Sequence, residues 1–96
     1  MQYGGSVYII TNVNNSVLYI GVTSNLLARV GEHRDRFYKE SFTDTYNCHK
    51  LVYYQSFPRI EEAIIQEKRM KKWKREWKFE LITSINPTWR DLYDEL

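Results

Sequence analysis

Three short runs rich in β-branched and aromatic residues predict β-strands. The first two, at residues 6–11 and 17–22, are separated by an asparagine-rich segment at 12–16. Asparagine tolerates turn conformations and bonds to nearby backbone, so these two runs predict a hairpin. A third run, at residues 49–57, is centred on consecutive apolar and aromatic residues and predicts another strand.

Apolar residues with helical spacing predict three helices. Residues 23–25 supply N-cap candidates for the first helix, and proline at position 58 suits the first turn of the second. The third helix must stop before Pro87, because the residue before a proline is driven out of the helical region. The predicted helices cover residues 26–37, 58–73 and 75–84, with a loop at 38–48 and a closing turn at 89–93.

The predicted order is β-β-α-β-α-α, with no linker or repeat between the elements. The chain of 96 residues is long enough for one domain. We therefore expect a single α+β domain over residues 1–96, in which helices flank a small three-stranded antiparallel sheet.

Composition narrows the class of protein. The chain has a single cysteine, which excludes an internal disulfide, and too few histidines to favour a structural zinc site. No apolar run approaches the roughly 18 residues of a membrane span, and no secretory leader is visible. These features predict a soluble cytoplasmic protein that does not enter a membrane.

Basic residues are concentrated in one segment although the net charge is only +2. Residues 68–78 carry seven of the fourteen lysines and arginines, with Trp73 and Trp77 among them. This cluster is either a solvated helix face or a surface for phosphates. We expect both tryptophans to pack in the core rather than to stack on bases.

An acidic residue interrupts the apolar stripe of the second predicted helix. Ile60, Ala63, Ile64 and Met70 share one side at helical spacing, and Glu67 falls in the middle of that side. Removing an unpaired carboxylate from water costs several kcal/mol. Glu67 therefore requires either a structural salt bridge or a functional site that binds a cation.

The first predicted helix carries a similar irregularity. His33 lies within its apolar stripe, and Arg29 and Arg36 border it on the same ridge. His33 is either a core histidine or, with its arginine neighbours, part of a surface that faces phosphate. A metal cluster of histidine and carboxylates lacks enough ligands there.

The predicted hairpin places two phenols on one face. Side chains alternate along strands, and the spacing of Tyr8 and Tyr19 allows them to be neighbours across the two strands. Tyrosines in strands usually serve packing. Gly21, on the same face as Tyr19, marks a close approach of a ligand or a backbone.

Taken together, these residues resemble the GIY-YIG nuclease family. Ser6-Val7-Tyr8 stands in the place of the first motif, with serine and valine for its glycine and isoleucine, and Tyr19-Ile20-Gly21 reproduces the second. The resemblance extends from about residue 6 to residue 93, most closely to small stand-alone bacterial members. The other matching residues are Arg29, His33, Glu67 on the later helix and Asn86 near the end.

The resemblance implies hydrolysis of phosphodiester bonds in DNA with one divalent cation, Mg²⁺ or Mn²⁺. Glu67 would bind the ion, and Mg²⁺ needs few protein ligands because it keeps several waters. The ion would stabilise the leaving oxygen. Arg29 would neutralise charge on the phosphate, and Asn86 would be a supporting polar group.

The same resemblance assigns the activation of water to the aromatic residues. Tyr8 would orient and deprotonate the attacking water, because nearby positive charge favours the phenolate form. Tyr19 and His33 would hydrogen-bond the water or the phosphate. How the role of base divides between tyrosine and histidine stays open.

We therefore predict a metal-dependent DNA endonuclease that acts in DNA repair or processing. The alternative is a nucleic-acid-binding module whose nuclease core is silent or depends on a partner. With no attached DNA-binding domain, we expect either weak or structure-selective DNA binding or a recruiting protein partner, and a chain that is a monomer or a weak homodimer. The residues predicted to contact DNA are Gly21, Arg36, Lys68, Lys71, Lys72, Lys74 and Arg75.

Overall fold

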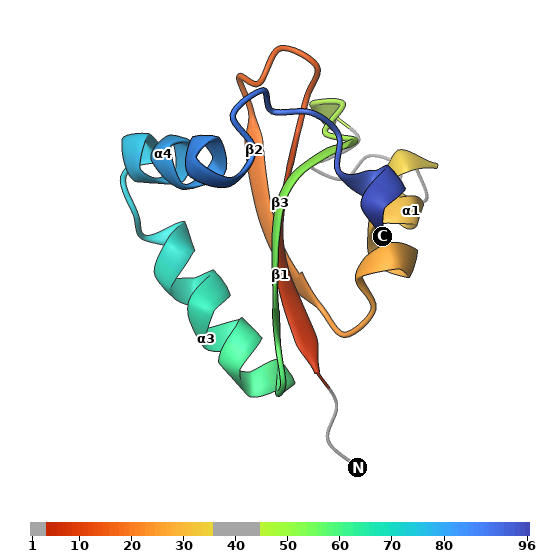
Figure 1. Ribbon diagram of the computed structural model, residues 1–96, viewed down its shortest axis with the longest axis vertical. Coiled ribbons are helices and arrows are strands. Elements are labelled where there is room, and N and C mark those ends of the chain that lie inside the picture. The colour runs from red at the N-terminus through yellow and green to blue at the C-terminus, as the bar shows by residue number, and fades with distance from the viewer. Residues whose placement is uncertain (1–3, 36–44) are drawn as a thin grey trace.

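A computed structural model describes residues 4–35 and 45–96. The elements follow the predicted order β-β-α-β-α-α, ending in a short 3₁₀ turn (Figure 1). Their bounds are β1 Gly5–Thr11, β2 Leu18–Thr23, α1 Leu26–Arg34, β3 Lys50–Phe57, α3 Ile60–Lys71, α4 Arg75–Ile85 and the 3₁₀ turn Tyr93–Glu95.

The three strands form one antiparallel sheet, as predicted, and the structure adds their order, β2-β1-β3. Asparagines close the β1–β2 hairpin. The Asn12 side-chain oxygen accepts hydrogen bonds from the amides of Ser16 and Val17, and Asn15 adopts a positive φ of 57°. Asparagine tolerates this left-handed conformation better than most residues, which explains the turn that the sequence predicted.

The two faces of the sheet carry separate cores. Because side chains alternate along β1, Val7 and Ile9 point to one face and Tyr8 and Ile10 to the other. Helices α3 and α4 cover the first face and α1 covers the second, together with the C-terminal segment (Figure 1).

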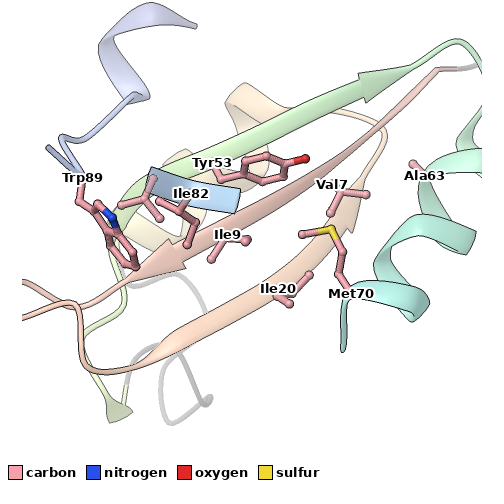
Figure 2. Packing of buried hydrophobic residues seen from close by; sticks show 9 residues of the cluster. Val7, Ile9, Ile20, Tyr53, Ala63, Met70, Ile82 and Trp89 are labelled. Carbon is pink, nitrogen blue, oxygen red and sulfur yellow. The ribbon is translucent and has the colours of Figure 1, made fainter. Parts of the chain in front are cut away.

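The first core is the larger of the two. Met70 and Ala63 of α3 pack against Val7 and Ile20 of the sheet, as Figure 2 shows. Gly5 permits this close packing, because a Cβ atom there would lie 2.9 Å from the Cα atom of Ile60. The second core contains Val30 of α1, Leu51 of β3 and Leu92 near the C-terminus.

The C-terminal segment returns to β3 and α1. The Leu92 amide donates to the Leu51 carbonyl oxygen at 2.7 Å, and the Leu51 amide donates to Asp91 Oδ1 at 3.2 Å. The other Asp91 oxygen forms an ion pair with Arg34 of α1. These contacts join the end of the chain to both neighbouring elements.

The predicted boundaries differ from the observed ones mainly at helix ends. Helix α1 ends at Arg34, whereas the sequence predicted an end at residue 37, which lies outside the described residues, as does most of the predicted loop. Helix α3 starts two residues later than predicted, because Arg59 is an extended N-cap with φ −128° and ψ 138°. Among the residues that the structure describes, no helix has the length and apolar character to cross a bilayer.

Candidate active site

Three aromatic rings meet on the α1 face of the sheet. The Tyr8 hydroxyl lies 3.2 Å from Nε2 of His33, in a buried hydrogen bond. The Tyr19 ring centroid lies 6.4 Å from that of Tyr8 and 5.8 Å from that of His33. The structure therefore brings together the two tyrosines and the histidine that the sequence singled out.

The strand register explains the position of Tyr8. Tyr8 pairs with Gly21 of β2 and Ile10 pairs with Tyr19, so the two tyrosines are diagonal neighbours on one face rather than directly opposite. A Cβ atom on Gly21 would lie 2.3 Å from the Tyr8 hydroxyl oxygen. The close approach expected at Gly21 is thus made by the Tyr8 ring, which covers this buried glycine.

Local capping fixes α1 and thereby His33 and Arg29. The Asn25 side chain accepts a hydrogen bond from the Ala28 amide at 3.1 Å, which caps the helix as predicted. His33 is buried in the last turn. Arg29, one turn earlier, is 40% exposed and forms an ion pair with Glu32 at 3.6 Å.

The environment of His33 favours its neutral form. Burial lowers the pKa of the imidazole below its ordinary value of 6.5, and the positive charge of Arg29 lowers the pKa further. Glu32 opposes this effect, and His49 adds to it. A neutral His33 keeps one ring nitrogen as a hydrogen-bond acceptor, and in the tautomer protonated at Nδ1 that acceptor is Nε2, which faces the Tyr8 hydroxyl.

Glu67 lies on α3, which covers the opposite face. Its side chain is 14% exposed and forms an ion pair with Lys71 at 3.3 Å. A salt bridge, one of the two expectations for Glu67, is therefore present. Lys71 itself is 53% exposed, so the carboxylate pairs with an exposed surface charge rather than with a buried partner.

A surface hollow lies between Lys71, which pairs with Glu67, and Tyr19 of the aromatic cluster. It has a volume of about 330 Å³ and is lined by Tyr19 and its neighbours Leu18 and Ile20 in β2, with Lys71 and Lys78 from α3 and α4. Because β2 is an edge strand, residues of α3 and residues of the opposite face meet around this edge. Tyr19 is the aromatic residue of the cluster that reaches this hollow.

Asn86 caps the C-terminus of α4 and is 2% exposed. Its side-chain amide donates to the carbonyl oxygens of Val52 at 3.1 Å and Arg90 at 2.8 Å. Its side-chain oxygen accepts from the Arg90 amide at 3.2 Å. These contacts give Asn86 a structural role, since they attach the segment after α4 to β3.

The basic cluster lies at the end of α3, in the following connection and in the first turn of α4. Its members Lys68, Lys71, Lys72, Lys74 and Arg75 are exposed. Arg75 also donates to the Ser16 carbonyl oxygen in the β1–β2 turn. Arg36 of the first predicted helix, which was also predicted to contact DNA, lies outside the described residues.

The expectation for Trp77 is wrong. Trp73 packs against the larger core as expected, but Trp77 is 50% exposed. The two residues are four apart, which would place them on one side of a continuous helix. The chain instead leaves the helix between them: α3 ends at Lys71, and Lys74 is an extended N-cap with ψ 150°.

The donor set of the site fits a single hard cation bound through one carboxylate. Within residues 4–35 and 45–96, no group of three or more histidine, cysteine, aspartate or glutamate side chains could hold an ion. Mg²⁺ does not require such a cage, because it retains waters and takes oxygen ligands from substrate phosphates. Glu67, partly exposed and paired with a surface lysine, offers one such oxygen ligand.

Two residues near the site were given no individual role by the sequence, although Lys78 belongs to the basic segment 68–78. Lys78 lines the hollow beside Tyr19, and its spacing of seven from Lys71 could have indicated a shared side only if the helix were continuous. Glu32 pairs with Arg29. Its spacing of three from Arg29 on one helix was a usable signal.

Comparison with known proteins agrees with the fold. The family of GIY-YIG catalytic domains matches residues 4–90. The chain therefore belongs to the GIY-YIG family of nucleases, and the resemblance drawn from its motifs is confirmed.

A solved structure supports the same assignment. The solution NMR structure of UPF0213 protein BH0048 from Bacillus halodurans is similar, with a TM-score of 0.58 and 25% sequence identity. The similarity covers 92% of each chain. No curated protein matches the sequence.

Proposed function

We propose that this chain is a metal-dependent DNA endonuclease with a role in DNA repair or processing. The observation that carries the proposal is the buried contact between Tyr8 and His33, 3.2 Å apart, with Tyr19 beside them. Membership of a nuclease family supports the class of reaction. The contact supplies a phenol with an adjacent proton acceptor.

Tyr8 acts as the base in this proposal, with His33 as its partner. His33 is neutral near pH 7 because burial lowers its pKa, so Nε2 can accept the phenolic proton. The phenolate then takes a proton from the attacking water, which approaches past Tyr19. Tyr19 is less buried than Tyr8 and holds the water or a phosphate oxygen from the surface hollow.

Charge on the phosphate is balanced from two sides. Arg29, at the exposed border of α1, neutralises the non-bridging oxygens, for which its guanidinium is suited. Glu67 holds a divalent cation, Mg²⁺ or Mn²⁺, in place of its contact with Lys71. When bound, the ion polarises the phosphate and stabilises the leaving oxygen.

DNA approaches along the exposed basic cluster and the hollow lined by Lys71 and Lys78. Lysines there displace counterions from phosphates, so binding weakens as the salt concentration rises. Gly21 makes no such contact in this proposal, because the Tyr8 ring covers it.

Plasmid nicking tests the proposal. Wild-type protein is expected to nick DNA with Mg²⁺ or Mn²⁺ and not with a chelator. Glu67→Gln and Arg29→Ala should each reduce the rate about 10²-fold or more. Glu62→Gln, an exposed acid on the same helix, is the matched control and should cleave like wild type. Full activity of Glu67→Gln with a preserved circular dichroism spectrum would refute the role of Glu67.

A DNA-binding module without turnover is the second candidate function. The observation that favours it is that both charged residues of the site are engaged, Arg29 with Glu32 and Glu67 with Lys71. Binding of DNA that depends on salt, with no cleavage under any divalent cation, would support this alternative. Cleavage by the purified chain would exclude it.

A further inference from the structure

Trp77 forms an exposed aromatic surface outside the aromatic cluster of the active site. Half of its side chain is accessible although it is a large apolar residue. With Trp73, Glu80 and Leu81 it lines a hollow of about 390 Å³. The role proposed for the active site makes no use of this hollow.

The charges around the hollow indicate what it would bind. The Lys74 ammonium lies 5.9 Å from the centroid of the Trp77 ring, and Lys78 follows Trp77 directly in the sequence. Glu80 lines the hollow itself and would repel a phosphate placed inside it. The flanking lysines favour phosphates beside the hollow, whereas Glu80 disfavours them inside it. A ligand with an uncharged aromatic part in the hollow and phosphates over the lysines agrees with both charges.

The position of the hollow relates it to the candidate active site. Lys78, the next residue along α4, lines the separate hollow that contains Tyr19. One helical turn therefore presents Trp77 to one hollow and Lys78 to the other. A strand whose phosphates contact Lys78 beside Tyr19 would bring a neighbouring nucleotide to Trp77.

We propose that Trp77 stacks on an unpaired base of the DNA substrate, with Lys74 and Lys78 holding the adjacent phosphates. This inference rests on the proposed function, which it extends to the class of substrate. Stacking on an indole requires a base that has left the duplex, since within a duplex the base pairs above and below cover both faces of each base. The preferred substrate therefore contains a single-stranded segment next to the cleaved bond.

The test compares two DNA probes in a binding assay with chelator present, so that no cleavage contributes. Fluorescence anisotropy measures the Kd for a labelled single-stranded oligonucleotide and for a labelled blunt duplex. Trp77→Ala should weaken single-strand binding about 5- to 100-fold, as for other stacked bases. Duplex binding should change less than about twofold. Trp77→Phe, which keeps an aromatic face, should retain most of the affinity.

Ile65→Ala is the matched control, because Ile65 is 51% exposed on α3. It should bind both probes like wild type. Single-strand binding that is unchanged in Trp77→Ala, or equal losses for single-stranded and duplex DNA, would overturn the stacking proposal. So would a change from dimer to monomer in Trp77→Ala without a change in Kd, which would assign the surface to a second copy of the chain.

The outcome separates this inference from the proposed function. Nicking that persists while Trp77→Ala binds normally would overturn the stacking site and leave the nuclease intact. A protein that never cleaves, yet loses single-strand binding in Trp77→Ala, would keep the stacking site and refute the nuclease.

Discussion

The Tyr8 ring crosses Gly21 so closely that a Cβ atom at Gly21 would lie 2.3 Å from the phenolic oxygen. The glycine of the second motif therefore makes room for the tyrosine of the first. The two residues pair across β1 and β2, so their fit depends on the hairpin register. Mutations at either position are expected to affect the other.

Gly21→Ala should destabilise the protein by about 1–3 kcal/mol, because the buried Tyr8 ring must move. Urea unfolding measures this change. In a Tyr8→Ala background the same substitution should cost much less, since the obstructing ring is absent. Gly31→Ala is a useful contrast, because within residues 4–35 and 45–96 the contact recorded for its Cβ atom is with the Tyr93 hydroxyl, at 3.3 Å. Equal costs of Gly21→Ala in both backgrounds would contradict the packing explanation.

Tyr8→Phe should reduce plasmid nicking about 10²-fold or more, because it removes the group proposed to activate water. Tyr19→Phe should reduce nicking less, since Tyr19 only positions the water or the phosphate. Single-turnover rates distinguish the two variants. Tyr54→Phe is the control, because Tyr54 pairs with Tyr8 from β3 and has no proposed role in the reaction. A larger loss in Tyr19→Phe than in Tyr8→Phe would transfer the role of base to Tyr19.

The stability of the protein should fall as the pH drops below about 6.5. The pKa of His33 is lowered in the folded state, so between the folded and unfolded pKa values the unfolded chain binds more protons. The contribution of His33 to the free energy of unfolding therefore rises with pH in that interval. The same contribution is lost on acidification. Urea midpoints between pH 8 and pH 5 measure the slope. His33→Gln should flatten it, and an unchanged slope in His33→Gln would contradict this assignment.

Asn86→Ala should act mainly on stability. It removes both donors and the acceptor that hold Val52 and Arg90, and each buried group left unpaired costs about 1–3 kcal/mol. We expect a total loss of about 2–4 kcal/mol in urea unfolding. Thr88→Ala, at an exposed position two residues away, serves as the control. Normal stability combined with lost nicking would instead give Asn86 a role in the reaction.

The sequence predicted the strands and the shared face of Tyr8 and Tyr19 because a side-chain period of two needs only local information. The pairing of Tyr8 with Gly21 rather than with Tyr19 depends on the register. That register follows from the length and backbone of the hairpin turn, including the positive φ of Asn15. The sequence pattern alone did not determine these features.

Helical periodicity correctly marked Glu67 as an unusual acid, and the structure leaves it only 14% exposed. The expectation for Trp77 rested on its aromatic character rather than on periodicity, and the structure leaves this residue 50% exposed near the start of α4. Of the two carbonyl oxygens bound by Asn86, that of Arg90 lies four residues along the chain, but that of Val52 lies 34 residues away. No local pattern in the sequence could have indicated that contact.

The family match ends at residue 90. Beyond it, the Asp91 side chain accepts a hydrogen bond from the Leu51 amide, and the Leu92 amide donates one to the Leu51 carbonyl oxygen. Leu51 belongs to β3, an outer strand of the sheet. A chain shortened after residue 90 would keep the whole matched domain and yet uncover these two groups. Uncovered strand edges recruit strands from neighbouring molecules. Such a shortened chain should therefore aggregate. Residues 91 and 92 would then serve to protect the edge of β3 from pairing with other molecules.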